Sequence, residues 1–254
     1  MTLFHTPTAY LILGLLYFIM PTITWFVLTG HRTLAVKLWC GGGILVGLGF
    51  LLVAARGHVP AWATFPLANL LVFAYGMMRI QSLRIDLTVP WHWEWMTAAA
   101  LLFVFVLESI RLGLGNLTLM AIYNHSIFTV LSAYLAALAL RVAHQEQSPS
   151  VRWIAYAYFF IAGSMLYGVI AFSIGWYSPL PNALESNSVR LIVGIVALPG
   201  VVIAHIAYIG FILDRTHRQT IKMEHELRAS EARFRSYFKL PLTGRAITSP
   251  SMGW

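Results

Sequence analysis

Hydrophobic residues fill seven long stretches of this chain, and short polar segments separate them. Each stretch is close to the roughly 20 apolar residues that an α-helix needs to cross the hydrocarbon core of a bilayer. The pattern therefore predicts an all-α membrane protein built as a seven-transmembrane helix bundle. The expected spans are Thr8–Gly30, Lys37–Ala55, Trp62–Ile80, Trp91–Leu112, Leu117–Leu140, Trp153–Trp176 and Val189–Leu213.

The seventh stretch continues into a charged segment without a turn signal, because Gly and Pro are both absent between Phe211 and Leu240. Within it, residues recur in alternating steps of three and four, the heptad spacing that holds one side of a helix against a partner helix. This seam consists of Leu213, Thr216, Thr220, Met223, Leu227, Ser230, Phe234 and Tyr237. The pattern predicts that one helix leaves the membrane and forms a signalling coiled coil, with a homodimer through this cytoplasmic helix. A solvated helix that holds anionic lipid through its basic residues is the alternative.

Pro199 and His205 interrupt the apolar run of the seventh stretch. Proline bends a membrane helix, so we expect a signal to change the packing of this span around Pro199. The residues expected to transmit the signal are Pro199, His205, Leu213, Thr220, Met223 and Leu227. In the second span, Gly43 and Gly47 are spaced to let another helix approach closely.

The composition agrees with a lipid environment, because 59% of the 254 residues are hydrophobic and only 10% are charged. The net charge of +8 does not indicate nucleic acid as a partner, since the basic residues lie in short loops and in the C-terminal tail. A single cysteine, Cys40, excludes an internal disulfide framework and a cysteine-based metal cluster.

The distribution of Lys and Arg predicts the orientation. Fourteen of these residues fall in the first, third and fifth loops and the tail, Arg79 among them, whereas three fall on the opposite side. Basic residues concentrate on the cytoplasmic side of membrane proteins. We therefore expect a multi-pass protein of a bacterial inner membrane, with the N-terminus in the periplasm and the C-terminus in the cytoplasm.

Polar residues inside the expected outer halves of the spans are the candidate ligand-binding residues, because such groups are costly in lipid. They are Asn69, Glu108, Arg111, Asn124 and His125, to which Arg56 is added from the loop that caps the same side. One interpretation is a polar cavity that receives an unknown small-molecule signal. In the other, Glu108 and Arg111 pair on one helix, and Asn69 and His125 form hydrogen bonds between helices.

Other functions find less support in the residues. Haem or metal at His125 or His205 is disfavoured, because the two histidines lie about 10 Å apart along the bundle at 1.5 Å per residue. A retinal pigment needs a lysine inside a span, and Lys37, Lys222 and Lys239 are not so placed. A small transporter or channel is the alternative function. It requires polar groups in both halves, and the inner half offers little beyond Ser164, Tyr167 and His205.

Residues Ser230-Glu-Ala-Arg-Phe-Arg235 with Phe238 resemble the opening of bacterial PAS sensor domains. Pro241–Gly244 and Ala246–Trp254 resemble the first strand and turn of that domain, which implies a PAS domain truncated near its start. The resemblance divides the chain into a sensory domain (1–213), a signalling helix (214–238) and a PAS start (239–254).

The membrane part, with Arg56-Gly-His-Val-Pro60 and Pro66-Leu-Ala-Asn69 after a Gly-rich second span, is similar to the seven-helix input regions of bacterial sensor proteins. In such proteins PAS modules precede a diguanylate cyclase or histidine kinase output. The resemblance implies a sensory input module that is not itself an enzyme, because no kinase or cyclase motif occurs in these residues.

Overall fold

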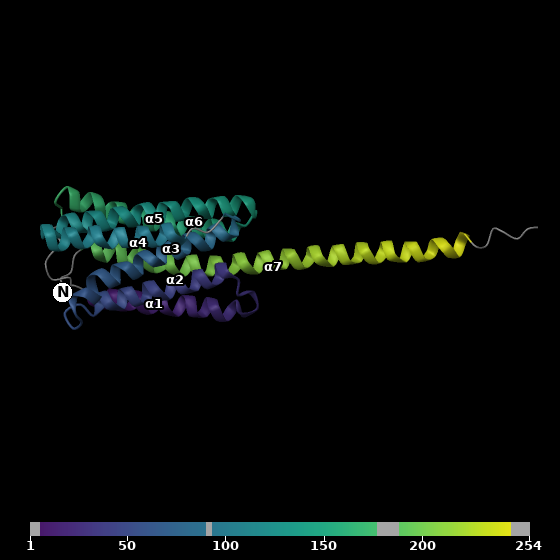
Figure 1. Ribbon diagram of the computed structural model, residues 1–254, viewed down its shortest axis with the longest axis horizontal. Coiled ribbons are helices and arrows are strands. Elements are labelled where there is room, and N and C mark those ends of the chain that lie inside the picture. The colour runs from purple at the N-terminus through teal and green to yellow at the C-terminus, as the bar shows by residue number, and fades with distance from the viewer. Residues whose placement is uncertain (1–5, 90–92, 177–187, 245–254) are drawn as a thin grey trace, which may run out of the picture. The chain divides into compact units, whose positions relative to one another are not determined.

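The computed structural model describes residues 6–89, 93–176 and 188–244, and within these ranges the chain is helical with no strand (Figure 1). The seven α-helices are α1 (Thr6–Val27), α2 (Leu34–Ala54), α3 (Ala68–Asp86), α4 (Trp93–Glu108), α5 (Leu117–Gln145), α6 (Pro149–Ser173) and α7 (Ser188–Gly244). A 3-10 turn, η1 (Thr29–His31), follows α1, and two π-helical turns, η2 (Ala63–Leu67) and η3 (Ser109–Leu114), precede α3 and follow α4. The predicted all-α class is confirmed.

Seven helices in the described residues are long and apolar enough to cross a membrane, so the chain is a multi-pass membrane protein. Large apolar side chains point away from the bundle. Examples are Leu101, Phe105, Phe159 and Phe160, each more than 60% exposed. In water such a surface would drive aggregation, whereas lipid solvates it at no cost.

Helices α1 to α6 and the part of α7 up to Ile212 lie side by side (Figure 1). The α1–α2, α2–α3 and α5–α6 pairs pack most extensively, and α3 also contacts α5. The largest core cluster joins side chains of α2, α3, α5, α6 and α7, among them Trp39, Leu135, Tyr158 and Tyr208. Helix α4 is the least buried of the seven, and its main core residues, Phe103 and Leu107, face α3 and α5.

Because consecutive helices run in opposite directions, each loop belongs to one of two ends of the bundle. The end with the α2–α3 loop, which contains Arg56, is called the Arg56 end; it also holds η2, η3 and the start of α5. The end with η1, which is followed by Arg32, is called the Arg32 end.

Close packing of α1 on α2 depends on glycine. A Cβ atom added at Gly43 would come within 2.9 Å of Pro21, and one added at Gly47 would lie 3.0 Å from the Gly14 carbonyl oxygen. The predicted close approach at Gly43 and Gly47 is therefore confirmed, with α1 as the partner.

The third span differs from its predicted bounds, Trp62–Ile80. Its first turn is π-helical around Pro66, and α3 continues past Ile80 to Asp86. The apolar pattern ended the prediction too early, because Arg79 was counted as a loop residue. In the structure Arg79 lies within α3 and is 1% exposed. Removing it from the count leaves thirteen basic residues on the side assigned to the cytoplasm against three, so the predicted orientation is unaffected.

Helix α7 is a single helix with the bounds Ser188–Gly244, as the uninterrupted pattern predicts. It contributes to two compact units, residues 1–212 and 213–254. Pro241–Gly244, which resembles a first PAS strand, belongs instead to the last turn of α7. A strand needs a neighbouring strand for its backbone hydrogen bonds, and the described residues contain none. The remaining PAS-like residues, 245–254, lie outside the described residues.

Candidate ligand cavity

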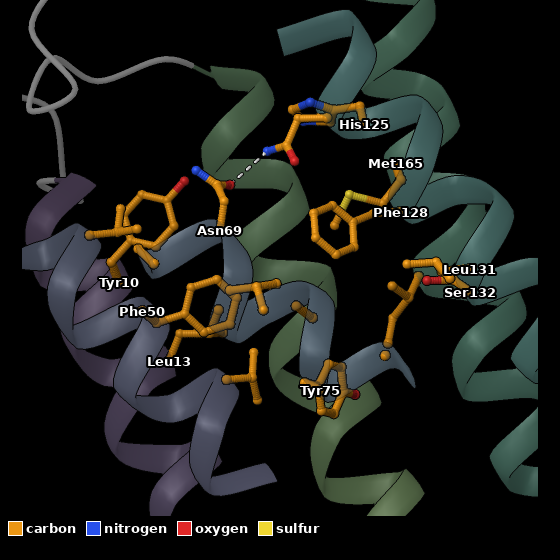
Figure 2. A pocket seen from close by; sticks show the side chains of 18 of the residues that line it. Tyr10, Leu13, Phe50, Asn69, Tyr75, His125, Phe128, Leu131, Ser132 and Met165 are labelled. Atoms are coloured by element: carbon orange, nitrogen blue, oxygen red, sulfur yellow. Dashed lines mark hydrogen bonds between the residues drawn. The ribbon is translucent and has the colours of Figure 1, made fainter. Parts of the chain in front are cut away.

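A cavity of about 220 Å³ opens inside the bundle toward the Arg56 end. Side chains from α1, α2, α3, α5 and α6 line it, and α7 contributes Ala197 (Figure 2). Along α5 the lining extends from Ala121 past His125 to Leu135. Ten residues separate His125 from Leu135, so this part of the cavity is about 15 Å deep at 1.5 Å per residue. The cavity therefore penetrates well into the membrane-spanning part of the bundle.

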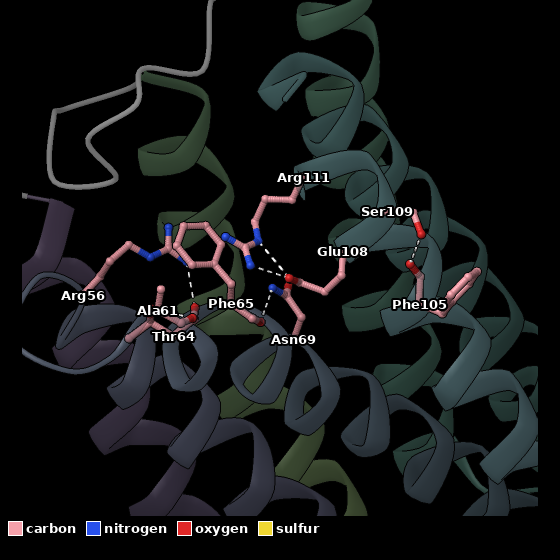
Figure 3. A network of polar contacts seen from close by, with 9 residues as sticks. All are labelled: Arg56, Ala61, Thr64, Phe65, Asn69, Phe105, Glu108, Ser109 and Arg111. Carbon is pink, nitrogen blue, oxygen red and sulfur yellow. Dashed lines mark hydrogen bonds and ion pairs between the residues drawn. The ribbon is translucent and has the colours of Figure 1, made fainter. Parts of the chain in front are cut away.

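Two asparagines form the polar side of the cavity. Asn69 Nδ2 donates to the Phe65 carbonyl oxygen at 2.8 Å (Figure 3). Asn124 Nδ2 donates to Asn69 Oδ1 at 3.4 Å (Figure 2). Because a carbonyl oxygen only accepts, the first bond fixes the orientation of the Asn69 amide, and that amide fixes Asn124 in turn. Asn124 Oδ1 is buried and has no hydrogen-bond partner among the described residues.

His125 lies beside Asn124 on the same lining surface. Its Nδ1 donates to the Ala121 carbonyl oxygen at 2.8 Å, and its ring meets the Phe172 ring edge-on with centroids 5.4 Å apart. The ring also lies against Gly168 of α6, where an added Cβ atom would be 2.4 Å from His125 Cδ2. Gly168 thus provides the space that the imidazole occupies.

A network of charged groups surrounds Phe65 at the Arg56 end (Figure 3). The Arg56 guanidinium lies 3.9 Å from the centroid of the Phe65 ring, and the Arg111 guanidinium lies 4.8 Å from it. Arg56 Nη2 also donates to the Thr64 carbonyl oxygen at 2.9 Å. Arg111 Nε is 3.0 Å from both carboxylate oxygens of Glu108, and Arg111 Nη2 completes a two-pronged ion pair.

The two π turns build this network. Thr64 and Phe65 belong to η2, and their carbonyl groups accept hydrogen bonds from the side chains of Arg56 and Asn69. The turn η3 begins directly after Glu108 and contains Arg111. Single π turns within membrane helices are frequently found at functional sites. The turn η3 ends at Gly115 with φ 61°, a left-handed conformation that favours glycine.

The structure therefore separates the six predicted ligand-binding residues into two groups. Arg56, Asn69, Asn124 and His125 line the cavity, whereas Glu108 and Arg111 pair with each other and do not line it. Glu108 and Arg111 form the ion pair that the second interpretation predicts. Asn69 accepts a hydrogen bond from Asn124 that joins α3 to α5. The prediction that all six converge on one cavity is wrong for Glu108 and Arg111, because their i,i+3 spacing favours their own ion pair.

Tyrosines that are not among the predicted ligand-binding residues close the inner part of the cavity. The hydroxyl groups of Tyr75 and Tyr158 are 2.8 Å apart, and the Tyr17 ring meets the Tyr75 ring edge-on at 5.7 Å. All three line the cavity. Tyr75 also lies 5.2 Å from the Arg79 guanidinium, measured from its ring centroid.

Toward the Arg32 end from Tyr75 lies the Arg79 cluster, which we define as Thr24, Trp39, Arg79, His205 and Tyr208. Arg79 Nη2 donates to His205 Nε2 at 2.7 Å, so the neutral ring carries its proton on Nδ1 and donates to Thr24 Oγ1 at 2.9 Å. Thr24 Oγ1 donates onward to the Met20 carbonyl oxygen. Each group in this series of hydrogen bonds therefore donates to the next, from Arg79 through His205 and Thr24 to the Met20 carbonyl oxygen.

Aromatic rings surround these hydrogen bonds. The Arg79 guanidinium lies 3.6 Å from the Trp39 centroid, and the Trp39 ring stacks on Tyr208 at 4.0 Å. The cluster contradicts the prediction that the inner half offers little beyond Ser164, Tyr167 and His205. The sequence does contain a feature from which the position of Arg79 can be predicted. No Gly or Pro occurs between Ile80 and Pro90, so the helix can continue past Ile80, which places Arg79 inside it.

The two histidines considered for haem or metal occupy separate sites. His205 uses both ring nitrogens in the Arg79 cluster, and His125 packs between Gly168 and Phe172. In the parts of the chain that the structure describes, no group of three His, Cys, Asp or Glu side chains is arranged to hold a metal ion.

The residues predicted to transmit a signal lie along α7. His205 is fully buried, Pro199 is exposed within the helix, and its neighbour Gly200 faces Ile161 of α6, 3.1 Å from an added Cβ atom. The helical assignment continues through Pro199. Leu213, Thr220, Met223 and Leu227 are exposed, with 60% of Met223 and 62% of Leu227 accessible.

Comparisons of the chain with protein-family models, with curated proteins and with solved structures give no match.

Proposed function

We propose that this chain is a sensory input module, in which a small molecule in the cavity changes the position of α7. One observation carries the proposal: Tyr75 lines the cavity and lies against Arg79, and Arg79 holds His205 of α7. A ligand that displaces Tyr75 therefore acts on a buried hydrogen bond that attaches α7 to α3.

Helix α7 also makes polar contacts through His205 Nδ1, which donates to Thr24 Oγ1 of α1 at 2.9 Å, and through the Tyr208 hydroxyl, 3.3 Å from Ser82 Oγ of α3. Much of the rest of its buried surface is apolar: Ala197, Val201, Ala204, Ala207 and Phe211. Apolar contacts are not directional, so such a helix can slide or rotate at low cost once its polar contact is changed. The Arg79–His205 bond then decides between two positions of α7.

The exposed seam of residues 213–237 provides the output. Its heptad spacing fits a parallel pair of helices from two copies of the chain, so rotation of α7 changes the register of a homodimer. Under this proposal the Arg56 end faces the periplasm of a bacterial inner membrane, and the seam lies in the cytoplasm. The PAS-like residues then connect the module to a histidine kinase or diguanylate cyclase output.

Disulfide cross-linking in native membranes tests this proposal. In a Cys40→Ala background, Met223→Cys lies on the seam and His225→Cys lies two residues off it. We expect mild oxidant to cross-link the first variant and not the second. Filling the cavity with Ser132→Phe or Gly76→Val should then change the rate of Met223→Cys cross-linking.

The matched control is Val130→Phe, which adds similar bulk to the same helix at a side chain that is 66% exposed. It should leave the cross-linking rate unchanged. If Met223→Cys and His225→Cys cross-link equally, the seam does not join two copies. If neither cavity-filling variant alters the rate, the cavity is not coupled to α7 and the sensory proposal fails.

A small transporter is the second candidate, and the Arg79 cluster is the observation in its favour. With Asn69 and Asn124 toward one end and Arg79 and His205 toward the other, polar groups occupy both halves of the bundle. However, Arg79 and His205 are no more than 1% exposed and are joined by a hydrogen bond, so the inner half is closed. Solute flux into liposomes that contain the purified protein would favour this candidate over the sensor.

A further inference from the structure

Asn124 Oδ1 is a polar atom of the cavity lining whose hydrogen-bonding requirement is defined by its neighbours. The Phe65 carbonyl oxygen sets the orientation of Asn69, and Asn69 sets that of Asn124, so the buried Asn124 Oδ1 must be an acceptor. It has no partner among the described residues. A buried acceptor without a donor costs free energy, and a ligand that supplies an N–H or O–H group there removes this cost.

Aromatic rings make up a large share of the cavity wall, beside aliphatic side chains such as Leu13, Val72 and Leu131. Eight of the described lining residues carry aromatic rings of the Phe or Tyr type, and two methionines face the same space: Tyr10, Tyr17, Phe50, Phe65, Tyr75, Phe128, Tyr158, Phe172, Met120 and Met165. Aromatic rings favour edge-on contacts with other rings, and methionine sulfur adds favourable contacts with ring edges. These rings offer an aromatic ligand edge-on contacts that an aliphatic chain cannot make.

The charge of the lining indicates a neutral ligand. No Asp or Glu side chain is among the described residues that line the cavity, so an organic cation has no counter-ion there. Arg56 is the cationic lining residue, and its guanidinium already binds the Thr64 carbonyl oxygen and covers the Phe65 ring. An anion would have to compete with these contacts.

The volume limits the size. A buried apolar cavity of about 150 Å³ holds one benzene molecule, which has six carbon atoms. In proportion, the 220 Å³ here accommodates about nine non-hydrogen atoms. This is the size of a two-ring heteroaromatic molecule or of a phenol with a two-carbon substituent.

We propose that the cavity binds a neutral aromatic molecule of about nine non-hydrogen atoms whose single N–H or O–H group donates to Asn124 Oδ1, in the manner of an indole or an alkylphenol. The ring lies among Phe50, Phe128 and Tyr75, and the donor faces the Asn69–Asn124 pair. The biological role of this ligand rests on the proposed sensory function. The chemical class of the ligand is inferred from the geometry of the cavity alone.

Equilibrium dialysis of the full chain in lipid nanodiscs tests the inference, with empty nanodiscs as the correction for partition into lipid. The probes are radiolabelled indole and indene, which has the same ring size but a CH₂ group in place of N–H. We expect one equivalent of indole to bind, and indene to bind about tenfold more weakly, as loss of one net hydrogen bond implies. This comparison needs no substitution and so does not depend on a variant that folds.

Variants then locate the site. Asn124→Leu should weaken indole binding about tenfold and leave indene binding unchanged. Ser132→Phe should weaken both probes, and Val130→Phe should weaken neither. Equal binding of indole and indene to the unmodified chain overturns the inference, as does a failure of both probes to bind.

The cross-linking experiment separates this inference from the proposed function. Indole binding that depends on Asn124 but does not change Met223→Cys cross-linking would leave the ligand chemistry in place and remove the sensory role. A change in cross-linking with indene and none with indole would retain the sensor and overturn the ligand chemistry.

Discussion

The guanidinium of Arg79 donates to Nε2 of His205 at 2.7 Å, and this bond joins α3 to α7 inside the bundle. The two residues are 126 positions apart in the chain, and both are almost completely buried. A buried guanidinium is costly unless its surroundings compensate it. Here a neutral imidazole and the face of Trp39 provide part of that compensation, while Arg79 Nε and Nη1 have no hydrogen-bond partner among the described residues. Arg79 therefore depends on His205 for its hydrogen bond.

The first prediction concerns this bond. His205→Phe keeps the ring but removes the acceptor, and it should lower the free energy of unfolding by about 2–4 kcal/mol because Arg79 is left buried with its charge less compensated. His217→Phe, at an exposed position of the same helix, should change it by less than about 0.5 kcal/mol. Unfolding in mixed detergent–SDS micelles measures both. Combining His205→Phe with Arg79→Leu should cost less than the sum of the two single changes, and strict additivity would show that the bond contributes no coupling.

A second prediction concerns the space beside His125. Gly168→Ala should reduce stability by about 1–3 kcal/mol and disturb the cavity, because the new methyl group collides with the imidazole. Gly163→Ala is the matched control on the same helix, since an added Cβ atom there has no neighbour within 4 Å. Thermal unfolding of both variants in nanodiscs makes the comparison. Equal melting temperatures would mean that His125 does not occupy this position.

A third prediction separates the ion pair from the cavity. Glu108→Gln should lower the free energy of unfolding by about 1–2 kcal/mol, because the amide gives Arg111 a weaker acceptor than the carboxylate. Since Glu108 does not line the cavity, binding of an aromatic probe should be unchanged. Glu94→Gln, exposed on the same helix, is the control for the loss of charge. Weaker probe binding in Glu108→Gln alone would place Glu108 in the ligand site.

The fourth prediction tests whether α7 acts as a helical rod. One residue inserted after Thr220 turns the following seam by about 100°, whereas seven residues turn it by only about 20° from its original phase. In the Cys40→Ala background, cross-linking of the seam position Phe234→Cys should be lost with one added residue and retained with seven. Equal effects of the two insertions would argue against a coiled pair.

The fifth prediction concerns orientation. In the Cys40→Ala background, His58→Cys lies at the Arg56 end and His225→Cys lies in the exposed part of α7. The excess of basic residues predicts that a membrane-impermeant maleimide labels the first in intact bacterial cells and the second only after lysis. Labelling of His225→Cys in intact cells would reverse the proposed orientation and place the seam outside.

The sequence alone was sufficient for the number of helices, because each must present about 20 apolar residues to lipid and that requirement is local. It also predicted that the seventh helix continues past Phe211 without a break, since neither Gly nor Pro occurs between Phe211 and Leu240. The spacing of Gly43 and Gly47 predicted that a helix packs closely on α2, and the structure identified that helix as α1. In each case the residues that carried the prediction are close together along the chain.

Tertiary structure decided which polar residues meet. Arg56, Asn69, Asn124 and His125 share a cavity and Glu108 does not, and this depends on the rotation of each helix and on the two π turns. The Arg79–His205 bond escaped prediction because hydropathy counts a charged residue as a span end, whereas a partner from a distant helix lets it remain inside. Burial inside the bundle is a property of the pair, and no single stretch of sequence carries it.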